Sequence, residues 1–124
     1  MLKLMPVTDR EVLERYAAEY GVPVDESLCL TIADQRGECL GVCFYRFTPE
    51  GMRIEYADAN GDGDLFDGLL RASMAALMDK SEDTVAFSER IDHELLRAWS
   101  FLKEGEVCVK SANAFFETCK KCKN

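Results

Sequence analysis

The sequence has little of what membrane spans, nucleic-acid surfaces and histidine clusters require. No apolar run approaches the roughly 18 residues of a membrane-spanning helix, and the N-terminus, with Lys3, becomes charged too soon for a signal peptide. Only 15 Lys and Arg residues face 23 Asp and Glu residues, for a formal net charge of −8. Such a surface repels phosphate backbones and anionic lipid, so we expect neither nucleic-acid nor membrane partners. His93 is the single histidine, which excludes a histidine cluster, and we expect it on the surface.

Proline and glycine are also scarce, with three and eight residues among 124. These counts exclude collagen-like and low-complexity sequence. The chain is 48% hydrophobic and 31% charged, which is typical of one folded domain of this length. We therefore expect a single cytoplasmic domain over residues 1–124, with residues 119–124 as a flexible, lysine-rich tail.

The six cysteines are expected to be reduced thiols in a cytoplasmic protein. Cys39 and Cys43 fall in one expected strand, where four steps separate them by about 13 Å. That exceeds the roughly 7 Å Cα limit of a disulfide and the span of two thiolates around one zinc. Cys119 and Cys122 form a C-x-x-C without the second pair that a zinc ribbon needs. We predict no metal site.

Hydrophobic periodicity predicts short strands and three helical segments. Thr8 and Glu11 form a capping box that opens the first helix, and Gly21 ends it. Residues 52–58 alternate, which places Met52, Ile54 and Tyr56 on one face of a strand. We expect strands over residues 2–7, 27–33, 38–46, 52–58, 84–88 and 106–110, helices over residues 8–20, 65–80 and 92–101, and a short helix or tail over residues 113–122. This order, β-α-βββ-α-β-α-β, predicts an α+β fold with a mixed, mostly antiparallel sheet flanked by helices.

This order and three sequence segments resemble the GNAT superfamily of acetyl-CoA-dependent N-acetyltransferases. Residues 4–9, Leu-Met-Pro-Val-Thr-Asp, look like the first strand of the family running into its first helix. Residues 65–72, Leu-Phe-Asp-Gly-Leu-Leu-Arg-Ala, look like the start of its cofactor-binding helix, and residues 95–101, Leu-Leu-Arg-Ala-Trp-Ser-Phe, like its closing helix. The resemblance implies a short, degenerate GNAT-like domain that uses acetyl-CoA and an unidentified amine acceptor.

Members of the family hold the cofactor pyrophosphate in an R/Q-x-x-G-x-G/A loop at a helix N-terminus, where the dipole favours an anion. Residues 58–63 keep both glycines of this loop but place Asp58 at its basic position. A second register places Asp64 and Phe66 at the glycine positions. Asp62 and Asp67 add further negative charge that opposes a pyrophosphate. The resemblance therefore implies a weakened loop whose cofactor contacts come from Asn60, Gly61, Gly63, Asp64, Leu65 and Arg71.

The catalytic groups that the resemblance implies are only partly present. Glu55 lies on the strand where many members carry the general base, a role that needs a pKa raised by burial; a solvent-facing glutamate is the alternative. Leu96 stands where many members have the tyrosine that protonates the departing thiolate. Two functions follow: an acyl-CoA-dependent N-acetyltransferase with a weakened pyrophosphate loop, or a catalytically inactive GNAT-like binding or interaction domain. A homodimer is compatible with both.

The same loop also matches the opening of a calcium loop, D-x-[DN]-x-[DN]-G, over residues 58–63. Position twelve, which should be a bidentate glutamate, is Leu69, and the preceding residues have a strand pattern. We therefore expect no EF-hand, while a weak cation site in the loop from Asp58 to Asp64 stays open as part of the binding-domain alternative.

Overall fold

A single six-stranded sheet forms the centre of the molecule in the computed structural model, which describes residues 2–122, and the side chains of residues 2–117. The strands follow one another in chain order across the sheet, and every neighbouring pair is antiparallel except β4 and β5, which are parallel. The strands are β1 (Leu2–Pro6), β2 (Leu28–Gln35), β3 (Glu38–Thr48), β4 (Gly51–Asp58), β5 (Thr84–Phe87) and β6 (Cys108–Val109). The predicted α+β class with a mixed, mostly antiparallel sheet is confirmed.

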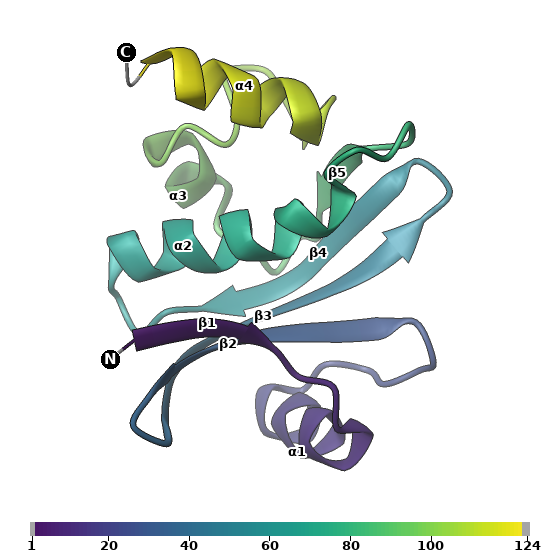
Figure 1. Ribbon diagram of the computed structural model, residues 1–124, viewed down its shortest axis with the longest axis vertical. Helices are drawn as coiled ribbons and strands as arrows, with labels where there is room; N and C mark the ends of the chain where they lie inside the picture. Colours follow the sequence, from purple (N-terminus) through teal and green to yellow (C-terminus); the bar gives the residue numbers. More distant parts are fainter. Residues whose placement is uncertain (1, 123–124) are drawn as a thin grey trace.

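Helices cover both faces of this sheet (Figure 1). Helix α1 (Arg10–Tyr20) lies on one face, where Leu13 and Ala17 pack with β2 and β3 in one hydrophobic cluster. The larger hydrophobic cluster lies on the other face and includes Leu70 of α2 and Leu96 of α3. The elements on that face are α2 (Gly63–Met74), the 3-10 helix η1 (Ala75–Leu77), α3 (His93–Ala98) and α4 (Ala112–Cys122). None of the described helices has the length and hydrophobicity that crossing a membrane requires.

Several element ends differ from the predicted ones because capping groups move them. Asp9, not Thr8, caps α1, and its Oδ1 accepts a hydrogen bond from the N–H of Glu11 at 2.9 Å. Helix α2 begins two residues earlier than predicted because Asp62 caps it. The predicted last strand over residues 106–110 is reduced to Cys108–Val109. The flexible tail predicted over residues 119–124, which includes Cys119 and Cys122, stays a prediction. Residues 123–124 and the side chains of residues 118–122 lie outside the described part of the chain.

A bulge in β4 changes which face its side chains occupy. Tyr45 of β3 pairs with Ile54, whereas the preceding Phe44 pairs with Tyr56, so Glu55 is the additional residue on β4. An extra residue bends a strand and shifts its alternation by one. Ile54 therefore packs in the α2 cluster, whereas Tyr56 packs against the α1 cluster. The predicted strict alternation of residues 52–58 is wrong at Tyr56 for this reason.

Gly51, the first residue of β4, lies very close to the backbone of β5. Gly51 has φ +147°, and a Cβ there would lie 2.3 Å from the carbonyl oxygen and 2.6 Å from the nitrogen of Thr84. We expect Gly51→Ala to lower the free energy of unfolding by about 3 kcal/mol or more, since backbone must move. Gly37→Ala is the matched control: its φ is +86° in open space, so only conformational strain of about 1–2 kcal/mol is expected. Urea denaturation measures both; equal losses would contradict the close approach.

Candidate functional site

The parallel pair of β4 and β5 ends halfway along β4. The last paired residues are Ile54 and Phe87. The next residue of the β5 chain, Ser88, donates from its N–H to the carbonyl oxygen of Ile54 at 2.9 Å and from its hydroxyl to that of Glu55. The chain then turns away toward α3, so residues 56–58 of β4 keep their β3 partners but have no strand on the other side among residues 2–122. The two strands thus part after Ile54 and Phe87.

A short loop carries the chain from this open edge into α2. The Asp58 carboxylate accepts the N–H of Asn60 at 2.9 Å, and the Asn60 side-chain amide donates to the carbonyl oxygen of Leu40 at 2.8 Å. Asn60 and Gly61 both have positive φ, at 53° and 84°. The predicted cofactor residue Asn60 therefore has its side chain engaged in anchoring the loop to β3.

The first turn of α2 presents backbone N–H groups at the same corner. Asp62 accepts the N–H of Leu65 at 3.1 Å, and Phe66 donates to the Asp62 carbonyl oxygen at 2.9 Å. The N–H groups of Gly63 and Asp64 precede these bonds, and groups at this position have no intrahelical acceptor. Of the predicted cofactor residues, Gly63 and Asp64 thus offer anion donors, whereas the Leu65 N–H is already capped and its side chain is buried.

A tryptophan that sequence reasoning did not assign to the site covers part of this turn. Trp99 follows α3, and its indole lies against Gly63 so closely that a Cβ there would be 2.3 Å from Cζ2 and 2.8 Å from Nε1. Gly63 is therefore needed for packing as well as for any approach of an anion. No spacing in the sequence indicates this contact, because it joins two helices that are separated by β5.

The loop aspartates are largely engaged within the protein. Asp58 and Asp62 accept the backbone bonds described above, and Asp67 forms an ion pair with Arg71 at 2.9 Å, one helical turn further on. The Arg71 guanidinium lies over the rings of Phe101 and Phe115, at 5.5 and 4.9 Å. Arg71 is also eight residues along α2 from Gly63, about 12 Å along the helix axis. The structure therefore does not bring the predicted cofactor residue Arg71 to the first turn of α2, whereas Asp64 is there and exposed.

Glu55 lies where the two strands part, on the side that α1 covers. Its side chain is 17% exposed, and its Oε1 lies 3.5 Å from Nε of Arg53 and 3.8 Å from Nε of Arg46. Arg46 also binds Asp25 at 2.9 Å. The structure thus places the predicted general base at the bulge, but within an ion-pair cluster and not in an apolar pocket.

Aromatic and cationic groups that the sequence did not single out surround the same opening. The Arg90 guanidinium lies 4.5 Å from the Tyr56 ring centre and donates to the carbonyl oxygens of Tyr20 and Gly21 at 2.8 and 3.1 Å. Burial, with help from the Asp58 charge, raises the pKa of Tyr20, so this phenol keeps its proton at neutral pH. Leu96, which stands where the resemblance implies a proton-donating tyrosine, is fully buried, and its hydrocarbon side chain has no acidic proton.

The thiols and carboxylates do not assemble a metal site in the part of the chain with described side chains. No group of three or more His, Cys, Asp and Glu residues converges there, and in the loop that resembles a calcium site Asp58 and Asp62 accept backbone N–H groups instead. Burial raises the pKa of the Cys43 thiol to about 12, which keeps it protonated. His93, expected on the surface, is half-buried and lies 3.4 Å from the carbonyl oxygen of Ser88.

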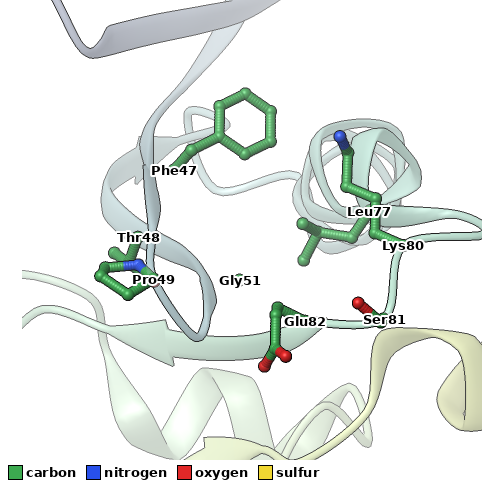
Figure 2. Close-up of a pocket in the computed structure, with 8 residues that line it drawn as sticks. All are labelled: Phe47, Thr48, Pro49, Gly51, Leu77, Lys80, Ser81 and Glu82. Atoms are coloured by element: carbon green, nitrogen blue, oxygen red, sulfur yellow. The ribbon is translucent and has the colours of Figure 1, made fainter.

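An open pocket of about 490 Å³ lies at the other end of β4. In Figure 2, Phe47 and Lys80 stand on one side of it and Ser81 and Glu82 on another. The Lys80 ammonium lies 5.7 Å from the Phe47 ring centre. None of the residues that the sequence predicted for the site lines this pocket. Gly51, which lines it, is the first residue of β4, whereas the predicted cofactor loop follows Asp58, the last residue of β4.

Comparison with solved structures finds the same arrangement of sheet and helices in the solution NMR structure of YhhK from E. coli, a "putative N-acetyl transferase" bound to coenzyme A. The two structures superpose with a TM-score of 0.54 over 87% of this chain and 96% of that chain, at 10% sequence identity. No family model and no curated protein matches the sequence. At this identity the likeness concerns the fold alone, and it shows that the chain has the GNAT-like α+β fold.

Proposed function

We propose that this protein binds an acyl-coenzyme A and transfers its acyl group to an amine. One observation carries the proposal: β4 loses its β5 partner after Ile54, and α2 begins at the same corner with the N–H groups of Gly63 and Asp64 directed out of the helix. The GNAT-like fold, shared with a coenzyme A-bound structure, supports it.

The open edge of β4 suits the amide-bearing arm of coenzyme A, and the first turn of α2 suits its pyrophosphate. The amide-bearing arm can pair with the open edge of residues 56–58 as an added strand would. The pyrophosphate suits the first turn of α2, where backbone donors and the helix dipole favour an anion. The Trp99 indole narrows that turn, and the exposed Asp64 opposes an anion there. We therefore propose binding that is weakened by this chain's own residues.

In the transfer itself, the amine nitrogen attacks the acyl carbonyl carbon, the carbon–sulfur bond breaks, and the departing sulfur takes a proton. Glu55, at the point where the strands part, is proposed to accept the amine proton directly or through one water. Tyr20 keeps its proton at neutral pH and lies on the same side of the sheet, and it is proposed to give that proton to the departing sulfur. These roles are proposals for this chain's residues.

A binding domain without catalysis is the second candidate, and a specific observation favours it. Leu96 is buried where the resemblance calls for a proton-donating tyrosine, and the Glu55 carboxylate is held by two guanidinium groups. Such a domain would still bind coenzyme A at the open edge, so binding and turnover must be measured separately.

Acetyl-CoA at about 1 mM is expected to raise the melting temperature, because a ligand that binds only the native state stabilises it by RT ln(1 + [L]/Kd). Pantetheine, which lacks the pyrophosphate, should raise it less. Differential scanning fluorimetry measures both shifts. No shift with acetyl-CoA would overturn both candidate functions.

Removing the exposed charge at the first turn of α2 should strengthen binding. We expect Asp64→Asn to tighten acetyl-CoA about 2- to 10-fold, because a carboxylate within several ångströms of a pyrophosphate repels it. Glu14→Gln removes the same charge from an exposed position on α1, on the other face of the sheet, and should change affinity little. Isothermal titration calorimetry compares them; equal effects would show that the pyrophosphate lies elsewhere.

Turnover separates the two candidate functions. With acetyl-CoA and a panel of primary amines, chromatography should detect free coenzyme A and acetylated amine with the wild-type chain. Glu55→Gln should lower kcat by about 100-fold, the lower end of what a general base contributes, and leave the acetyl-CoA Kd unchanged. Binding without turnover for every amine would support the binding domain and contradict the transferase.

A further inference from the structure

Strand β1 leaves one side of the sheet open. Among the described strands it lies at the edge and pairs with β2 alone, and all five of its residues are exposed. Among seven exposed large hydrophobic side chains in the described part of the chain, three lie here: Leu2, Leu4 and Met5, at 47, 38 and 40% exposure. The opposite edge is a two-residue strand, β6. An open strand with apolar side chains is a template for pairing with another strand.

The direction of the β1 backbone follows from its register with β2. Val7 donates its N–H to the carbonyl oxygen of Leu30 at 2.9 Å, next to the paired residues Pro6 and Thr31. In an antiparallel pair, alternate residues direct both backbone groups toward the partner. The backbone polar groups of residues 3, 5 and 7 therefore point toward β2. Those of Leu2, Leu4 and Pro6 point away from β2, toward the open edge. Pro6, which has no N–H, stands where none is needed for β2.

We propose that β1 is the interface of a homodimer, in which β1 of a second copy pairs with it antiparallel and Leu4 lies opposite Leu4. In this register the Leu4 N–H donates to the Leu4 carbonyl of the other copy, and the Leu2 N–H donates to the Pro6 carbonyl. Each bond occurs twice by two-fold symmetry, as in an isologous interface. Both outward N–H groups are used, all five residues overlap, and the missing N–H of Pro6 leaves no donor unpaired.

The side chains fit the same register. Leu4 lies against Gly68 of α2, where a Cβ would be 3.2 Å from the Leu4 Cδ1, so the two Leu4 side chains meet on the α2 face. On the other face, Lys3 of one copy is opposite Met5 of the other, which avoids the like-charge pairs that destabilise sheets. The dimer shares no residue with the proposed acyl-CoA site, so the two proposals stand or fail separately.

Charge and area set the expected strength. Each copy carries a formal charge of −8, so repulsion opposes association and added salt, which screens it, should strengthen the dimer. One strand pair buries less than the roughly 1,200–2,000 Å² of a standard interface. We therefore expect a dissociation constant of about 10–100 μM.

Sedimentation velocity of the full chain over about 5–500 μM tests the dimer. We expect a concentration-dependent dimer that is at least about 3-fold tighter at 0.5 M than at 0.05 M salt. Leu4→Lys should abolish it, because two ammonium groups would meet across the seam. Met78→Lys makes the same charge change at a side chain of similar exposure, 42%, beyond η1 and should dimerise like the wild type. A monomer at every concentration, or a dimeric Leu4→Lys, would overturn the proposal.

A cross-link tests the register even where Leu4→Lys does not fold. The proposed register places the two residues at position 4 about 5.5 Å apart at Cα, within disulfide range, whereas the two at position 5 lie beyond it. With diamide as the oxidant, which takes up two electrons and two protons as two thiols join, Leu4→Cys should form a 4–4 disulfide. Met5→Cys is the matched control. Mass spectrometry of non-reduced peptides identifies the bond; a 5–5 link formed equally well would contradict the register.

Discussion

The parting of β4 from β5 at residues 54–55 is the constraint on which the rest of the site depends. The bulge at Glu55 bends β4 and turns Tyr56 to the α1 face, while Ser88 holds the backbone of Ile54 and Glu55 as the last contact of the pair. A backbone edge that is not paired must find another partner or water. Because the loop from Asp58 to Asp62 is short and tied to β3 through Asn60, the N-terminus of α2 is fixed beside this open edge.

The aspartates of the acidic loop hold the local structure together, and this affects how strongly they repel an anionic ligand. Asp58 and Asp62 accept backbone N–H groups, and Asp67 is paired with Arg71. Asp58 shapes the turn and Asp62 caps α2, which gives the carboxylates gathered there a structural role. Asp64 is exposed and lies in the first turn of α2. Trp99, packed on Gly63, limits the space beside it. Both features would weaken the proposed binding of acetyl-CoA.

Periodicity and turn residues predicted most of the fold, because local rules decide it. Gly21 and the turn residues Arg36 and Gly37, with φ of 53° and 86°, end elements near where the sequence indicated. The alternation of β4 was predicted wrongly because a bulge depends on its partner strand and leaves no trace in the spacing. For the site, the resemblance implied Glu55 as a base and Gly63 and Asp64 as cofactor contacts; Gly63 and Asp64 lie in the first turn of α2 and Glu55 at the β4 bulge. It missed Trp99 and Arg90, whose contacts join elements distant along the chain, and it could not show that Arg71 turns toward Phe101 and Phe115.

Backbone amide chemical shifts during an acetyl-CoA titration test the central claim most directly, because they report where the ligand lies. We expect the largest changes at residues 56–58 and at Gly63 and Asp64, with slowed hydrogen exchange along the β4 edge. Changes confined to the pocket between Phe47 and Lys80, or no changes at millimolar acetyl-CoA, would contradict it.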